Sequence, residues 1–409
     1  GKDVHTLLPA DPLAGASPAE IAGRILATDP QLVALPVYAW NRDLVMEVTR
    51  VLREADSHIP IVLGGPEVAF DPARALRESG AGWVCAGEGE IPFVTLLNRL
   101  EDNPGDLSAL PGMVSRSDPD RPNTPPAPLV SPLDDIPSPY TTGIIAPQPG
   151  STVEMETMRG CPFGCNFCLY GKNYNQLRYF SLERVRADLS FLINSQAASI
   201  YIIDPTFNMP RQRCLNICRL LKELNPPGCR KIFVEVKAEY IDETMADAFL
   251  EAGIAAVEVG LQTTNPAALA LMGRSFDPAG FTRGMRLLRE REIWANIGVI
   301  AGLPGDSAGQ FRDTLRFVSD QALGRLLIYP LQVFPGSTFH RAARELGLQF
   351  EPAPSYQVTC TPLISGIARS VRMRSIFSRR AILSNLPSAS ASVLRSEGLP
   401  AWVIWSISA

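Results

Sequence analysis

The sequence predicts an α/β protein with an N-terminal Rossmann-like domain followed by a partial (β/α)6 barrel. Short apolar segments alternate with amphipathic segments over residues 1–105, and the same alternation returns from residue 151. This pattern is typical of parallel sheets covered by helices. A proline-dense stretch separates the two series, and 409 residues are enough for two or three domains.

The first series, over residues 1–105, is expected to form a doubly wound parallel sheet. Helices are predicted at 18–29, 44–55, 72–80 and 93–102, and strands at 31–40, 59–65 and 82–90. Ligands bind such sheets at the loops that follow the strands. The loops here are YAWNRD (38–43), GGPEV (64–68) and AGEGE (86–90).

Residues 106–150 are interpreted as an ordered linker, because proline at this density disfavours helices and central strands. The second series then has strands predicted at 153–158, 199–204, 231–238, 255–262, 294–306 and 325–334, with a helix between each pair. Six such units are two short of a closed barrel. We therefore expect a partial barrel over 151–340 and a C-terminal extension over 341–409.

Composition narrows the function classes. Hydrophobic residues make up 46 % and charged residues 20 %, which predicts ordered domains. A net charge of −4 argues against nucleic-acid binding. We find no apolar run of membrane-spanning length and no signal-peptide pattern, so we expect no membrane partner and a cytoplasmic location. Eight cysteines in a reducing setting point to a metal site or catalysis.

Three cysteines lie close together in RGCPFGCNFC (159–168), with the spacing Cys161-x3-Cys165-x2-Cys168. A structural zinc site is one interpretation, but zinc takes four ligands, and the three histidines, His5, His58 and His340, are distant in sequence. Cys214 and Cys218 are expected to be buried core residues. A [4Fe–4S] cluster held by three thiolates would keep one iron open, as a catalytic centre requires.

This motif, with the aromatic Phe167 before its last cysteine, resembles the signature of the radical S-adenosylmethionine (SAM) enzymes over about 151–340. The resemblance implies that the open iron chelates SAM, which is cleaved to a 5′-deoxyadenosyl radical. It also implies SAM contacts from the ends of the barrel strands, although a strict GGE motif is absent. The implied SAM residues are Phe167, Asp204, Glu235, Glu258, Gln262, Gly298 and Gly302.

The loops GGPEV and AGEGE resemble those of the cobalamin-binding domain that precedes some radical SAM barrels. The cobalamin residues this implies are Tyr38, Trp40, Asn41, Arg42, Gly64, Gly65, Glu67, Gly87, Glu88 and Gly89. The usual D-x-H-x-x-G motif, whose histidine ligates cobalt, is absent, since His5 in DVHTL lacks the following glycine. Related proteins bind cobalamin without a protein ligand to cobalt.

The resemblance implies a cobalamin-dependent radical SAM methyltransferase that methylates a carbon of a small molecule or natural-product precursor. It implies a [4Fe–4S] cluster, SAM, cobalamin and an external flavodoxin- or ferredoxin-type electron donor. In the tryptophan 2-methyltransferases of thiopeptide biosynthesis, a branch of this family, methylation proceeds without the usual radical. A rearrangement or cyclisation, and a non-catalytic homologue, stay open. Tyr329 and Tyr356 are candidate substrate residues, and the oligomeric state is left open.

Overall fold

A computed structural model describes residues 15–102, 110–117, 126–170, 176–226, 229–321 and 324–365. The chain divides into two compact units, residues 1–130 with 353–355, and residues 131–352 with 356–409. The division at Val130 and Ser131 falls inside the segment predicted as a linker. Part of that segment, β4 (Met113–Ser115), pairs with a strand of the first unit instead of standing apart.

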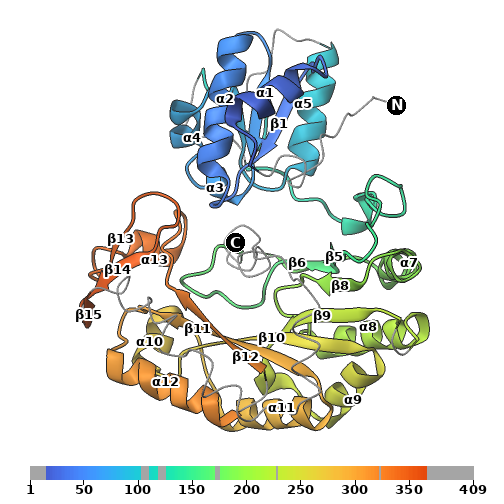
Figure 1. Ribbon diagram of the computed structural model, residues 1–409, viewed down its shortest axis with the longest axis vertical. Helices are drawn as coiled ribbons and strands as arrows, with labels where there is room; N and C mark the ends of the chain where they lie inside the picture. Colours follow the sequence, from blue (N-terminus) through green and yellow to red (C-terminus); the bar gives the residue numbers. More distant parts are fainter. Residues whose placement is uncertain are drawn as a thin grey trace. The chain divides into compact units, whose positions relative to one another are not determined.

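The first unit is a four-stranded sheet in the order β1-β2-β3-β4. Strands β1 (Val33–Pro36), β2 (Ile61–Gly64) and β3 (Trp83–Cys85) run parallel, and β4 is antiparallel to β3. The helices are α1 (Pro18–Leu26), α2 (Arg42–Ala55), α3 (Pro66–Ala69), α4 (Pro72–Glu78) and α5 (Glu90–Asp102). Figure 1 shows α5 across the sheet from α2 and α4. Helices on both faces confirm the expected Rossmann-like layering.

Local signals explain these helices. In α1, Ser17 and Glu20 form a capping box, in which each side chain accepts a hydrogen bond from the other's backbone. Asp71 caps α4 by accepting from the Arg74 backbone. Two apolar clusters then hold the sheet, one around Leu52 and Leu63 under α1, α2 and α4, and one around Leu96 under α5.

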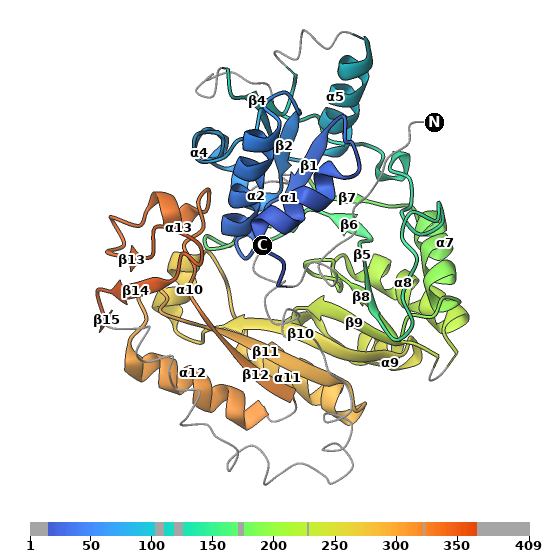
Figure 2. The ribbon, with the colours of Figure 1, turned by 45° about the horizontal axis from the view of Figure 1, so that its top comes forward.

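The second unit is a six-stranded parallel sheet in the order β12-β11-β10-β9-β8-β5. Its strands are β5 (Thr152–Met155), β8 (Ser199–Ile202), β9 (Lys231–Val236), β10 (Ile254–Gln262), β11 (Trp294–Ala301) and β12 (Gly324–Pro330). The intervening helices are α7 (Leu182–Ile193), α8 (Arg211–Leu224), α9 (Glu243–Glu251), α11 (Pro278–Glu290) and α12 (Ala308–Gln321). These helices cover the outer, convex side of the sheet (Figures 1 and 2). Since β5 and β12 stand at opposite edges, the predicted partial barrel is confirmed.

Several shorter elements were not predicted. They are β6 (Met158–Arg159), β7 (Arg178–Tyr179), α10 (Pro266–Met272), α13 (Thr338–Arg341), β13 (Gln349–Phe350), β14 (Val358–Thr361), β15 (Ile364–Ser365) and two 3-10 turns, Leu133–Asp135 and Ala238–Tyr240. Strands β13, β14 and β15 form a small antiparallel sheet within the predicted C-terminal extension. The rest of that extension, from residue 366, lies outside the described residues.

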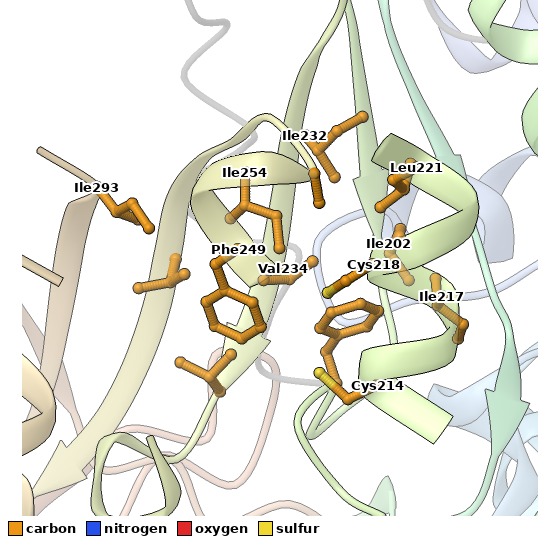
Figure 3. Packing of buried hydrophobic residues seen from close by; sticks show 14 of the residues in the cluster. Ile202, Cys214, Ile217, Cys218, Leu221, Ile232, Val234, Phe249, Ile254 and Ile293 are labelled. Atoms are coloured by element: carbon orange, nitrogen blue, oxygen red, sulfur yellow. The ribbon is translucent and has the colours of Figure 1, made fainter. Parts of the chain in front are cut away.

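The main core lies between the six-stranded sheet and its helices. Figure 3 shows Cys214 and Cys218 of α8 among the apolar side chains of this layer, and the two are 0 % and 2 % exposed. Both are therefore core residues, as the sequence predicted. Along each strand, every second side chain enters this layer. The alternate side chains line the opposite, concave face of the sheet, where the polar groups gather.

Within the described part of the chain, no helix is both long and apolar enough to cross a bilayer.

Candidate functional site

The cysteine loop follows the end of β5, at the edge of the sheet where barrel active sites lie. Strands β6 and β7 pair antiparallel, Met158 with Tyr179, and so bring together the two ends of the loop. Gly160 has a φ of +97°, and a Cβ atom there would lie 2.5 Å from the Gln176 carbonyl oxygen. Only glycine allows this close approach at the entry to the loop.

Asp204 anchors the segment before the loop. Its Oδ1 accepts hydrogen bonds from the backbone N–H groups of Thr157, at 2.7 Å, and Met158, at 3.2 Å. Its Oδ2 accepts from the Thr157 hydroxyl. Burial raises the pKa of Asp204 to about 6, although these hydrogen bonds and the Arg213 charge lower it. Asp204 is predicted to lie near SAM, and in the structure its carboxylate binds the backbone that leads into the cysteine loop.

The three loop cysteines are thiols, as are all eight cysteines of the chain. Cys165 is 7 % exposed, and its Sγ accepts a hydrogen bond from Arg274 Nη1 at 3.4 Å. Burial raises the pKa of the Cys161 thiol, and a negative charge on Cys165 raises it further.

The side chains of the loop limit the kind of metal group that it fits. Across the described residues, no set of three or more His, Cys, Asp or Glu side chains gathers closely enough for a single metal ion. A cluster differs from a single ion because each thiolate binds a separate iron. Three thiols on one anchored loop, with a guanidinium donor to Cys165, match the thiolate donor set of an iron–sulfur cluster.

Two further contacts hold the loop. The Asn166 side chain donates to the Leu271 carbonyl at 2.8 Å, and its backbone N–H donates to the Met272 carbonyl at 2.9 Å. These bonds satisfy carbonyl groups at the C-terminus of α10. On the other side, the Lys237 ammonium lies 4.8 Å from the centre of the Phe163 ring, in cation–π contact. Phe167 packs against an apolar cluster that includes residues of α10, of α13 and of the segment after β12.

Glu235 and Glu258 lie opposite each other on β9 and β10. Their strand neighbours Val234 and Val257 belong to the hydrophobic core, so both carboxyl groups lie on the concave face. The Tyr201 hydroxyl donates to Glu235 Oε1 at 2.9 Å. Burial raises the pKa of Glu235 to about 8, with a contribution from the Glu258 charge, and burial raises that of Glu258 to about 7. This face therefore holds carboxyl protons near neutral pH.

The remaining predicted SAM residues lie at the carboxyl end of the same face. Gln262 ends β10 with a φ of +70°, unusual for a residue with a side chain, next to a shift in strand register. Its amide nitrogen lies where a Cβ atom on Gly260 would point. A Cβ atom on Gly298 would lie 3.4 Å from the Tyr329 ring, so glycine leaves room for that ring. Gly302 follows β11 with a φ of +87°.

The two tyrosines proposed for the substrate are placed differently. Burial raises the pKa of Tyr329, with contributions from the Glu258 and Glu235 charges, so its hydroxyl shares the concave face with these carboxyl groups. Tyr356 is only 2 % exposed, and its ring meets Phe334 edge-on at 6.0 Å between centroids. Its ring is therefore part of the protein interior.

In the first unit, loop 38–43 follows β1. Asn41 closes this loop, since its Oδ1 accepts from the Tyr38 backbone at 2.7 Å and its Nδ2 donates to the Pro36 carbonyl at 3.1 Å. The Tyr38 and Trp40 rings stack at 4.5 Å, and Trp40 is 58 % exposed. The loop thus presents an aromatic surface to solvent.

Loop 64–68 follows β2 and is tied to the first loop by an ion pair. Arg42 Nε lies 3.2 Å from Glu67 Oε1, and Arg42 also pairs with Glu78 of α4. These two predicted cobalamin residues therefore neutralise each other. Gly65 has a φ of +107°, and a Cβ atom there would lie 2.6 Å from the Val37 carbonyl oxygen.

Loop 86–90 follows β3 and is the third of the predicted cobalamin-binding loops. Gly87 has a φ of +114°, and a Cβ atom there would lie 3.2 Å from that of Ala127. Glu88 is 4 % exposed. A Cβ atom on Gly64 or on Gly89 would be at van der Waals distance from the Cys85 side chain, so neither glycine is required by space. The structure thus brings all three predicted loops to the carboxyl edge of one parallel sheet, while His5 lies outside the described residues.

Sequence reasoning missed Arg274, Asn166 and Thr157. Three signals for Arg274 and Asn166 were present in NPAALALMG, which has an asparagine cap, a proline at the first helical position and a terminal glycine. These signals mark α10. Arg274 follows its C-terminal glycine, and its last two carbonyl groups accept hydrogen bonds from Asn166. No local pattern marked Thr157, because its role depends on a residue 47 positions away.

Comparison with protein families gives two matches. A model of the B12 binding domain matches residues 3–97, and a model of the radical SAM superfamily matches residues 155–318. The chain contains a B12-binding domain and a radical SAM domain. This confirms the domain make-up that the cysteine motif and the glycine loops predicted. A radical SAM domain implies a [4Fe–4S] cluster and SAM, and a B12-binding domain implies cobalamin.

Among curated proteins, the chain is similar to the cobalamin-dependent radical SAM methyltransferase TokK of Streptomyces tokunonensis. The two are 29 % identical over 355 residues, which is 80 % of this chain and 51 % of that protein. The chain is also 24 % identical to an anaerobic magnesium-protoporphyrin IX monomethyl ester cyclase of Cereibacter sphaeroides. That match extends over 318 residues and covers 74 % of this chain and 51 % of that protein. The chain thus spans about half the length of these relatives.

Among solved structures, the fold is similar to that of TsrM, a radical S-adenosylmethionine methyltransferase from Kitasatospora setae. The TM-score is 0.68 at 19 % identity, over 86 % of this chain and 71 % of that chain. At this identity the likeness establishes a shared fold.

Proposed function

We propose that this chain is a cobalamin-dependent radical SAM methyltransferase that methylates a carbon of a small molecule or natural-product precursor. The observation that carries the proposal is the pairing of a B12-binding domain with a radical SAM domain whose three-cysteine loop is anchored at the barrel's carboxyl edge. The similarity to TokK supports methyl transfer among the reactions of this domain pair. An external flavodoxin- or ferredoxin-type protein would deliver the electrons.

Cys161, Cys165 and Cys168 would hold the cluster, which supplies an electron to SAM when both are bound. The chain's own residues have positioning roles. Asp204 and Thr157 fix the start of the loop, and Asn166 fixes its middle against α10. The Asp204–Thr157 bond joins buried groups and the Asn166 bond lies nearer the surface; together they would fix the backbone on both sides of Cys161 and Cys165 before any ligand arrives.

The concave face of the barrel would receive SAM and substrate. Gln262, Gly298 and Gly302 lie toward its carboxyl end and, with Glu258 on the same face, are proposed to contact SAM. Glu235 is held by Tyr201 and retains a proton near neutral pH because burial raises its pKa to about 8. A protonated carboxyl donates a hydrogen bond, so Glu235 is suited to a carbonyl or hydroxyl oxygen of a ligand.

In the B12-binding domain, the loops after β1, β2 and β3 would contact cobalamin. Gly65 and Gly87 have no side chain at positions of positive φ, which lets a ligand approach the backbone. The exposed Trp40 ring, backed by Tyr38, offers a flat apolar surface. Arg42 and Glu67 are proposed to act through loop geometry, because each neutralises the other.

A second candidate is a cobalamin-binding radical SAM cyclase. It is favoured by the similarity to the magnesium-protoporphyrin cyclase, which covers nearly as much of this chain as TokK does. The products distinguish the two, since methylation adds one CH2 to the substrate and forms S-adenosylhomocysteine, whereas cyclisation does neither.

The test is anaerobic reconstitution with iron, sulfide and hydroxocobalamin, followed by SAM and a reductant. We expect 5′-deoxyadenosine and S-adenosylhomocysteine to form together. S-adenosylhomocysteine without deoxyadenosine would favour the non-radical branch of the family, and deoxyadenosine alone would favour the cyclase. Neither product, from protein with full iron and cobalamin content, would overturn the proposed function.

A further inference from the structure

Arg274 joins the cysteine loop to the end of a barrel strand. Its Nη1 donates to Cys165 Sγ at 3.4 Å, and its Nη2 donates to the Gly260 carbonyl at 2.8 Å. The Nε–H of the same guanidinium is buried and has no acceptor among the described residues. One side chain therefore donates to a cysteine sulfur and to strand β10 at once, while its Nε–H stays without an acceptor among the described residues.

The backbone around Arg274 holds the guanidinium in place. Helix α10 ends at Gly273, which adopts the left-handed conformation with a φ of +65°. The Arg274 backbone N–H then turns back to donate to the Leu269 carbonyl at 3.0 Å. This is the common glycine-terminated end of a helix, and it fixes the direction in which the next side chain leaves. The planar guanidinium with two fixed bonds has little freedom to move away from Cys165.

We propose that Arg274 is a positioning residue that raises the reduction potential of a cluster held by Cys161, Cys165 and Cys168. This inference rests on the proposed function, since it needs the cluster to be present. It concerns how readily the cluster accepts an electron, which neither the domain matches nor the three-cysteine motif determines.

The physical reason is the charge that reduction adds. One electron passes from the external ferredoxin- or flavodoxin-type donor to the cluster, so the cluster and its thiolates become one charge more negative. A donated hydrogen bond and a positive charge at Cys165 stabilise this reduced form more than the oxidised form. Cys165 is 7 % exposed, so water screens the interaction weakly.

A purely structural role for Arg274, as a brace between β10 and the loop, makes a different prediction. A brace affects folding and iron content, and it leaves the potential of a loaded cluster unchanged. The midpoint potential, measured by EPR-monitored redox titration of the full reconstituted chain, therefore separates the two roles.

The variants are Arg274→Gln, which removes the charge, and Arg274→Lys, which keeps the charge and loses the planar fork. Arg316→Gln serves as the matched control, because Arg316 lies on α12 with a side chain that is 75 % exposed. We expect Arg274→Gln to lower the ratio of reduced to oxidised cluster about tenfold at a fixed solution potential, a shift of about 59 mV for one electron. Arg274→Lys should shift less, and Arg316→Gln should match the unmodified chain.

A fully loaded Arg274→Gln protein with an unchanged potential would overturn the inference. If that variant takes up too little iron, Arg274→Lys decides: a lowered potential supports the role, and an unchanged one overturns it. Iron content of the unmodified chain is measured in parallel. Absence of a cluster there would refute the proposed function itself, and so the two failures are distinguishable.

Discussion

Asp204 Oδ1 accepts a 2.7 Å hydrogen bond from the backbone N–H of Thr157, four residues before Cys161. This contact joins the end of β8 to the segment that leads into the cysteine loop. Arg213 donates to the Thr157 carbonyl at 2.8 Å, so both backbone polar groups of Thr157 are held. The start of the proposed cluster loop is thus set by a buried carboxylate and a guanidinium from the neighbouring βα unit.

Replacing Asp204 with Asn should weaken this anchor. The amide keeps an acceptor oxygen for the Thr157 and Met158 backbone N–H groups but removes its charge, and it offers the Thr157 hydroxyl an NH2 donor in place of an acceptor. We expect a loss of about 1–3 kcal/mol in the free energy of unfolding, measured by urea denaturation, and a lower iron content after reconstitution. Asp313→Asn, at an exposed site on α12, should change neither quantity. Wild-type stability and iron content in Asp204→Asn would contradict the anchor role.

Substitution of a loop cysteine should lower the iron content of the reconstituted protein, and substitution of a cysteine outside the loop should not. Removing Cys165, as Cys165→Ala, should reduce bound iron and sulfide to a small fraction of the normal content, because one thiolate ligand is lost. Cys229→Ser, outside the loop and half-buried, serves as the control and should load normally. Iron and acid-labile sulfide analysis gives the readout. Equal losses in both variants would count against the assignment.

The raised pKa of Glu235 should make the stability depend on pH. Its pKa is about 8 in the folded chain and about 4.3 in an unfolded one. Between these values the folded state binds more protons than the unfolded state, so stability falls as pH rises. Glu235→Gln keeps the acceptor for Tyr201 and removes the ionisation. The variant should therefore lose less stability than the unmodified chain between pH 5 and pH 8 (about the span of the two values).

The measurement is the unfolding midpoint in urea at several pH values across this window. Glu183→Gln is the control, because Glu183 is exposed at the start of α7. That control should follow the unmodified chain at every pH. A pH profile of Glu235→Gln that coincides with the unmodified profile would show that Glu235 does not hold a proton in this range.

The exposed Trp40 ring is proposed to contact cobalamin. Trp40→Ala should weaken cobalamin binding about tenfold, equal to about 1.4 kcal/mol, because a large flat contact is lost. Stability should change little, since the side chain is 58 % exposed. Val94→Ala, on an exposed position of α5, is the control. Affinity is read from the visible spectrum during titration with hydroxocobalamin, and unchanged affinity would remove Trp40 from the site.

The fold was largely predictable because βα units leave strong local signals. Each barrel strand, such as 231–238, is a short apolar run bounded by turn residues, and the structure has it as β9 (Lys231–Val236). The short strands β6 and β7 were not predictable in this way. Their two-residue pairing depends on Gly160 and the chain returning after the loop, which no local periodicity reports.

The site was predictable where its metal-binding residues lie close together in the sequence. Three cysteines within eight positions mark a ligand set by themselves. Arg274 and Asp204 act on that loop from distant parts of the chain, so only the fold reveals their partners. Arg42 shows the reverse, because a charged loop residue that suggested a ligand contact is neutralised by Glu67 and Glu78.

The central claim is that three thiolates hold a [4Fe–4S] cluster with one iron open to SAM. The most direct test is the EPR spectrum of the reduced, reconstituted chain before and after SAM is added under anaerobic conditions. The account predicts a [4Fe–4S] signal whose shape changes when SAM binds, and its loss in Cys161→Ala. A signal that SAM leaves unchanged, or one that persists without Cys161, would contradict the claim.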